Sequence, residues 1–128
     1  MDTPLGKKIL VVDDSAPMRM LVSIIIKKVL PGISVTEAAN GIEALEKFKQ
    51  NIFDLILSDI MMPKMNGIEL IRAIRKELNN KVPIIVITTK DEENYRDAGI
   101  AAGASGYLTK PVDGQELKKM VYKFLTVI

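Results

Sequence analysis

The chain has 128 residues, of which 48% are apolar and 27% charged, and its formal net charge is +2. This composition is typical of one globular domain with a sizeable core, and so small a positive charge does not favour a nucleic-acid partner. Cysteine and histidine are both absent from the sequence, which excludes disulfides, thiolate nucleophiles, imidazole metal sites and Ser-His-Asp catalysis. Any chemistry must therefore use carboxylates, hydroxyls, lysines and hard cations.

The sequence gives no sign of export or of membrane insertion. Its first residues, MDTPLGKK, lack the apolar core of a signal peptide. The apolar run around residues 24–26 is far shorter than the roughly 20 residues that cross a bilayer. We therefore expect a soluble, cytoplasmic protein without membrane contact, and a single domain over residues 1–128, because no linker or repeat interrupts the pattern.

Apolar runs alternate with amphipathic segments along the chain. In order, the pattern predicts a strand over 7–13, a helix over 15–30, a strand over 33–38, a helix over 41–50, a strand over 53–59, a helix from 68 to about 78, a strand over 82–89, a short Ala-rich helix capped by Asp91, a strand over 105–110 and a helix over 115–125. Pro17 fits the first turn of the first helix, and Asn40 can cap the second. Such alternation predicts an α/β fold, a doubly wound parallel sheet of five strands with helices on both faces.

Polar side chains stand at the carboxyl ends of most of the predicted strands. They are Asp13 and Asp14 after the first strand, Asp59 after the third, Thr88 and Thr89 after the fourth, and Lys110 after the fifth. These ends meet at one edge of a parallel sheet, where ligands bind. Carboxylates that converge without a cation repel one another, whereas oxygen ligands suit Mg²⁺. We expect a magnesium ion at the acidic pair, which frees a third carboxylate to act as a nucleophile towards phosphorus.

Each of these residues has a plainer interpretation when it is taken alone. Asp14 could cap the helix that follows it, and Thr88 could be an ordinary strand residue. Lys110 could simply be solvated. Their coincidence at one edge, in a chain whose strands are otherwise apolar, favours a functional site.

The segments VVDD, DLILSDIMMPKMNGIEL, IIVITTK and AGASGYLTKP resemble the receiver domain of two-component response regulators over essentially the whole chain. The stand-alone, CheY-like members are the most similar. This resemblance implies a flavodoxin-like sheet with strand order 2-1-3-4-5. It also implies a histidine kinase as phosphoryl donor and a two-state switch that catalyses its own phosphorylation and dephosphorylation, in place of an enzyme acting on other substrates.

The matching motifs carry the family's site residues onto this chain. Asp59 would be the phosphoacceptor, and Asp14 and Asp59 would bind Mg²⁺ directly together with the backbone carbonyl of Met61. Asp13 would act through a bound water. Thr88 and Lys110 would hold phosphoryl oxygens, Tyr107 would turn inward on activation, and the Lys110–Pro111 bond would be cis.

Two positions beside the expected site depart from the family pattern. Met61 cannot hydrogen-bond an attacking water, and Thr89 is larger than the usual Ala or Gly. Lys90 could either hold phosphate charge or block the water. We therefore expect slow loss of the phosphoryl group.

The expected output surface surrounds Tyr107 and the last helix. Its residues are Tyr95, Tyr107, Lys118, Lys119, Tyr122 and Lys123, and they fit an acidic protein partner, although the lysines taken singly are an ordinary solvated face. A flagellar motor switch protein in chemotaxis, or a phosphatase, is the expected partner of a monomer that binds no nucleic acid.

Three alternatives stay open. The chain could be a stand-alone phosphorelay intermediate, or a receiver domain excised from a larger transcriptional regulator. An enzyme of the haloacid-dehalogenase type also uses an aspartate nucleophile and Mg²⁺. Its D-x-D motif on the first strand differs from the adjacent pair found here, and 128 residues leave little room for a substrate cap.

Overall fold

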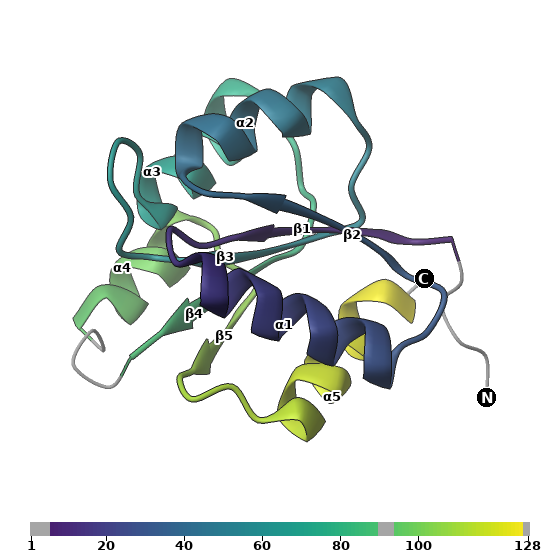
Figure 1. The fold of residues 1–128 in the computed structure, drawn as a ribbon. Helices are drawn as coiled ribbons and strands as arrows, with labels where there is room; N and C mark the ends of the chain where they lie inside the picture. The colour runs from purple at the N-terminus through teal and green to yellow at the C-terminus, as the bar shows by residue number, and fades with distance from the viewer. Residues whose placement is uncertain (1–5, 90–93, 127–128) are drawn as a thin grey trace.

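The computed structural model describes residues 6–89 and 94–126, which form one sheet and its covering helices (Figure 1). The strands are β1 (Lys8–Val12), β2 (Ser34–Ala38), β3 (Leu55–Asp59), β4 (Ile84–Thr88) and β5 (Gly106–Thr109). The helices are α1 (Ala16–Val29), α2 (Gly41–Gln50), α3 (Gly67–Arg72), α4 (Asn94–Ala102) and α5 (Gly114–Thr126), with a π-helical turn η1 (Ala73–Glu77) after α3. Lys90 and the predicted cap Asp91 lie outside the described residues.

All neighbouring strands are parallel, and their order is β2-β1-β3-β4-β5, as the resemblance implied. The register aligns the carboxyl ends of the central strands across the sheet. Val12 stands opposite Ser58, and Asp59 stands opposite Ile87. The residues that follow β1, end β3 and end β4 are therefore brought to one edge of the sheet.

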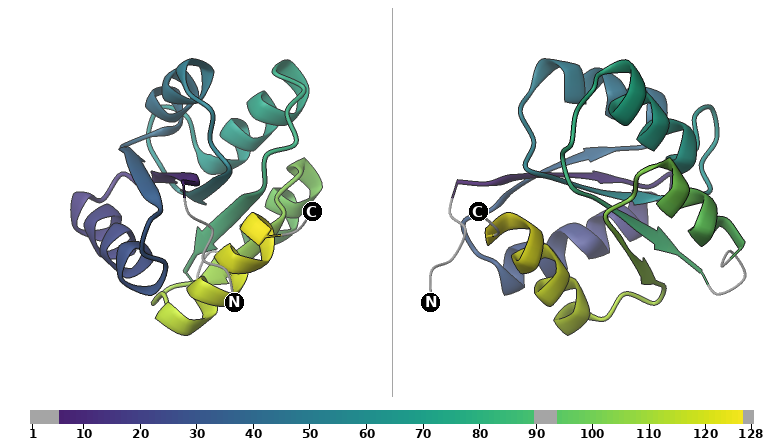
Figure 2. Two further views of the ribbon diagram at one scale, coloured as in Figure 1. Left: turned by 90° about the vertical axis from the view of Figure 1, so that its right-hand side faces the viewer. Right: turned by 180° about the vertical axis from the view of Figure 1, so that it is seen from behind.

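The two faces of the sheet carry separate apolar layers, because successive strand residues point to opposite sides. Leu10 and Val12 contribute to one layer, while Ile9 and Val11 contribute to the other. Helices α2, α3 and α4 cover the first layer, and α1 and α5 cover the second (Figure 2). Both faces of the three central strands are thus buried, which explains their continuous apolar sequences. Within the described residues, no helix is both long and apolar enough to cross a bilayer.

The helix boundaries show which side chains begin and end each element. Ser15, and not Asp14, caps α1, since its hydroxyl accepts a hydrogen bond from the Met18 N–H at 3.3 Å. This leaves the Asp14 carboxylate for another role. Asn40 caps α2 as predicted, accepting from the Glu43 N–H at 2.9 Å.

The helix predicted from 68 to about 78 is present, as α3 followed directly by the π-helical turn η1. In this turn the N–H of Leu78 reaches back five residues to the carbonyl of Ala73, at 3.1 Å. The sequence did not indicate the π-helical geometry, because apolar spacing does not distinguish a single wide turn from a regular one.

Candidate functional site

Three carboxylates converge at the carboxyl edge of the sheet. One oxygen from each of Asp13, Asp14 and Asp59 lies within 4.8 Å of the others. Asp13 and Asp59 are buried, at 4% and 5% exposure, while Asp14 is exposed. The cluster therefore opens to solvent on the side of Asp14.

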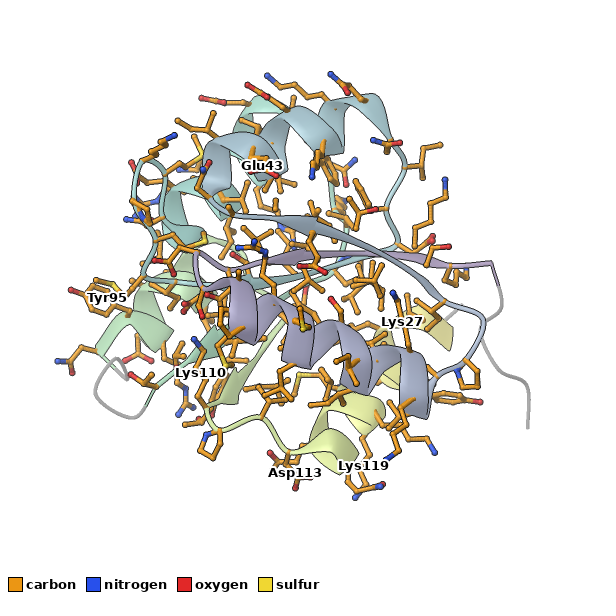
Figure 3. The ribbon with its side chains drawn as sticks, in the orientation of Figure 1. Lys27, Glu43, Tyr95, Lys110, Asp113 and Lys119 are labelled. Atoms are coloured by element: carbon orange, nitrogen blue, oxygen red, sulfur yellow. The ribbon has the colours of Figure 1, made fainter. Side chains whose placement is uncertain are left out.

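Lys110 supplies a positive charge to this cluster. Its ammonium donates to Asp59 Oδ2 at 3.2 Å and to Asp13 Oδ2 at 3.4 Å, and Figure 3 shows it at the end of the molecule where α1 begins. Burial of the ammonium disfavours its charge, but the attraction of Asp59 and Asp13 outweighs that effect and raises the pKa of Lys110 above its ordinary value. The Lys110–Pro111 peptide bond is cis. One ammonium thus bridges the two buried carboxylates.

The other oxygens of the two buried carboxylates accept backbone hydrogen bonds. Asp13 Oδ1 accepts from the Ser15 N–H at 2.9 Å, and Asp59 Oδ1 accepts from the Ile60 N–H at 2.8 Å. The loop after β3 then folds closely onto its end, where the Gly67 N–H donates to the Ile60 carbonyl at 2.8 Å. A Cβ at Gly67 would overlap the Asp59 carbonyl oxygen, so only glycine fits there without a backbone shift. Both buried carboxylates therefore have fixed directions.

The remaining predicted site residues lie at the end of β4, in the segment after β3 and on β5. Thr88 is the last residue of β4 and is 2% exposed, and Thr89 beyond it is half-buried. Met61, two residues after Asp59, is exposed at 45%. Tyr107 on β5 is partly buried against the core, with the Arg96 Cζ atom 4.0 Å from the centre of its ring.

The donor set fits a hard divalent cation. All three candidate ligand side chains are carboxylates, the type of ligand that Mg²⁺ prefers, and the exposed side leaves room for the waters that this ion retains. In the part of the chain that the structure describes, the Lys110 ammonium contacts two of the three carboxylates, which leaves negative charge for a cation to neutralise. Asp13, Asp14 and Asp59 are the side chains that could hold the ion, directly or through its waters.

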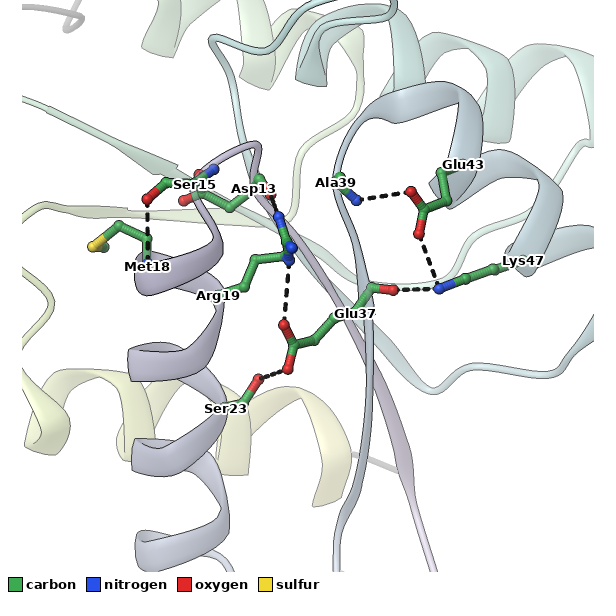
Figure 4. Close-up of polar contacts among 9 residues, drawn as sticks. All are labelled: Asp13, Ser15, Met18, Arg19, Ser23, Glu37, Ala39, Glu43 and Lys47. Atoms are coloured by element: carbon green, nitrogen blue, oxygen red, sulfur yellow. Dashed lines mark hydrogen bonds and ion pairs between the residues drawn. The ribbon is translucent and has the colours of Figure 1, made fainter.

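The sequence interpretation missed a polar network beside the cluster. Arg19 of α1 donates to the backbone carbonyl of Asp13 at 2.6 Å and to Glu37 Oε1 of β2 at 3.2 Å (Figure 4). A signal was present in the sequence. A basic residue in the first turn of a helix opposes the helix dipole, which indicates that a specific partner holds it there.

Part of the expected output surface lines a groove. Its volume is about 670 Å³, and it lies between β5 and α5, where Tyr107, Lys119 and Lys123 form part of its wall. Lys118 is exposed on the same helix, and Tyr95 is exposed on α4. The groove is separate from the acidic cluster.

Comparison with known proteins identifies a family. The model described as the response regulator receiver domain matches residues 9–122. The chemotaxis protein CheY of Thermotoga maritima is 42% identical over 108 residues, which cover 84% of this chain and 88% of that protein. A solved structure, the chemotaxis response regulator CheY4 of Vibrio cholerae, has a TM-score of 0.82 and 38% identity, covering 92% of this chain and 98% of that one.

Similarity extends equally to longer regulators. The transcriptional regulatory protein CpxR homolog of Haemophilus influenzae is 41% identical over 110 residues, which are 86% of this chain and 46% of that protein. The chain spans about half the length of several such curated relatives.

Proposed function

The chain belongs to the response regulator receiver domain family, and on that premise we propose that Asp59 accepts a phosphoryl group from a histidine kinase in a magnesium-dependent reaction. Receiver domains are phosphoacceptor switches that act on downstream partners. The observation that carries the proposal is the convergence of Asp13, Asp14 and Asp59 within 4.8 Å, with the Lys110 ammonium bridging the two buried members.

The chemistry requires an acidic site to bind a still more negative group. Asp14, Asp59 and the Met61 carbonyl would hold Mg²⁺, and Asp13 would act through a water. When bound, the ion neutralises charge on the carboxylates and on the phosphoryl group. An Asp59 oxygen forms a bond to phosphorus as the bond from phosphorus to the donor's imidazole nitrogen breaks. Lys110 and Thr88 then bind the phosphoryl oxygens, so the work of the protein is mainly positioning and electrostatic stabilisation.

In the proposed switch, phosphorylation of Asp59 changes the conformation of β5. Thr88 moves towards the phosphoryl group, and Tyr107 turns into the space that Thr88 leaves. Two observations support this. The Tyr107 ring is only partly buried, and Arg96, which lies 4.0 Å from its centre, is exposed, so this cation–π contact adds only about 0.5–1 kcal/mol to one ring position. A charge change at the sheet edge can therefore bias the ring between two positions.

We propose a protein partner for the surface around Tyr107 and α5. A flagellar motor switch protein in chemotaxis, or a phosphatase, is the first candidate for a cytoplasmic monomer in which residues 1–128 act as one receiver domain. Similarity to CheY supports that candidate. Equal similarity to transcriptional regulators favours, as the second candidate, a phosphorelay intermediate or the receiver part of a larger regulator.

Phosphorylation by acetyl phosphate tests the proposal. The intact mass of the protein should gain one phosphoryl group with Mg²⁺ and none with a chelator. Asp59→Asn should abolish the gain, and the matched control Asp97→Asn, an exposed aspartate on α4, should retain it. Repeated turnover of a small phosphoester without a lasting adduct would instead indicate a phosphatase of the haloacid-dehalogenase type.

A further inference from the structure

The side chain of Arg19 joins the acidic cluster to the neighbouring strand. Its Nη1 donates to the backbone carbonyl of Asp13 at 2.6 Å, and its Nε donates to Glu37 Oε1 at 3.2 Å. The side chain is 17% exposed. A guanidinium presents its donors in a rigid planar fork, so contact with Glu37 fixes the direction in which Nη1 points.

Glu37 is itself held from two sides (Figure 4). Its second carboxylate oxygen accepts from the Ser23 hydroxyl of α1 at 3.3 Å, and its backbone carbonyl accepts from the Lys47 ammonium of α2. Lys47 also pairs with Glu43 at 3.0 Å. The position of Arg19 is therefore set by α1 and by a strand that two helices flank.

We propose that Arg19 is a positioning residue for the magnesium site, and that it acts by fixing the peptide that joins Asp13 to Asp14. This inference rests on the proposed function. The Asp13 carbonyl and the Asp14 N–H belong to one planar unit, so a hydrogen bond that holds the carbonyl also limits where the Asp14 Cα and carboxylate can point. Asp14 is the exposed member of the cluster and gains most from such a restraint.

Charge alone gives the opposite expectation. A cation beside a magnesium site repels the metal, so electrostatics predicts that Arg19→Gln binds Mg²⁺ more tightly. Positioning predicts weaker binding, by about 10-fold, the lower end of the loss seen when a partner that orients metal ligands is removed. The direction of the change therefore separates the two explanations.

Titration calorimetry with Mg²⁺ on the full chain makes the test, after urea unfolding with a chelator has confirmed that each variant is folded. Lys28→Gln is the matched control, because it removes an exposed cation from the last turn of the same helix, α1, and leaves the contacts of Arg19 with Glu37 and Asp13 in place. We expect Arg19→Gln to bind about 10-fold more weakly than wild type and the control to bind as tightly or more tightly.

Arg19→Lys keeps the charge and serves if the glutamine variant does not fold. A lysine cannot reproduce the fixed fork between Glu37 and the Asp13 carbonyl, so its magnesium affinity should also fall. Affinity equal to or above wild type in either folded variant would overturn the positioning role. Wild-type protein that takes up no Mg²⁺ would instead overturn the proposed function itself.

Discussion

Replacement of Asp14 by asparagine should stabilise the metal-free protein. The Asp14 carboxylate lies within 4.8 Å of two others, and at that distance each repulsion is worth about 0.9 kcal/mol in bulk water and about 3.5 kcal/mol at an effective dielectric constant of about 20. Asp14 is exposed, so the lower figure applies, and attraction to Lys110 offsets part of it. We expect the free energy of unfolding of Asp14→Asn to exceed that of wild type by roughly 1 kcal/mol.

Magnesium should make wild type more stable than Asp14→Asn. Ligand binding stabilises the folded state by RT ln(1 + [L]/Kd), which is about 1.4 kcal/mol when free Mg²⁺ is about ten times its Kd. Wild type should gain this energy, and Asp14→Asn, which lacks a ligand, should gain little.

Urea unfolding with a chelator and with saturating Mg²⁺ measures both effects. Glu46→Gln, an exposed carboxylate on α2, should change the free energy of unfolding by less than about 0.5 kcal/mol in either condition. The electrostatic reasoning would be refuted if Asp14→Asn had a lower free energy of unfolding than wild type in the chelator. It would also be refuted if Mg²⁺ raised the free energy of unfolding equally in wild type and variant.

Three further predictions follow from other contacts. Gly67→Ala should lower the free energy of unfolding in urea by about 2 kcal/mol, because its Cβ overlaps the backbone at the end of β3, whereas Gly114→Ala, whose Cβ meets only ordinary contacts, should change little. The hydrogen bond from Lys47 lowers the pKa of Glu43, so the stability that this carboxylate contributes is complete above its ordinary value of 4.5 and is lost as the pH falls through the lowered one. The free energies of unfolding of Glu43→Gln and wild type, measured across this pH range, should therefore become equal in acid. A difference between them that persists in acid would contradict the assignment. Met61→Asn should shorten the lifetime of the phosphorylated protein about tenfold by giving the attacking water one hydrogen bond worth about 1.4 kcal/mol, whereas a wild-type half-life of only seconds would contradict the expected slow loss.

The fold could be predicted from the sequence because the apolar runs, their alternation with helices and the residues at the strand ends all indicate the same parallel sheet. Apolar runs such as residues 55–57 have no polar face, so they fit only strands buried on both sides. Alternation with helices then makes the sheet parallel, and parallel strands collect their end residues at one edge. For this reason Asp13 and Asp59, 46 residues apart in the chain, could be placed together before the structure was known.

The partners in the contacts that orient those residues could not be predicted, even at Arg19, where a basic residue in the first helical turn indicates that some partner exists. The pairing of Arg19 with Glu37 depends on how α1 packs against β2, and a list of strand ends says nothing about helix residues. Ser15 and Asp14 are both good capping residues, and only the backbone geometry decides between them. Likewise, the sequence places Gly67 in a loop but does not indicate its close approach to the end of β3, because that approach is a tertiary contact.

Identification of the modified residue tests the central claim most directly. After reaction with acetyl phosphate and Mg²⁺, reduction with borohydride converts a phosphorylated aspartate to homoserine, and peptide mass spectrometry locates it. We predict homoserine at position 59 alone and only when Mg²⁺ is present. Modification at another residue, or modification of Asp59 when a chelator replaces Mg²⁺ during the reaction, would contradict the account.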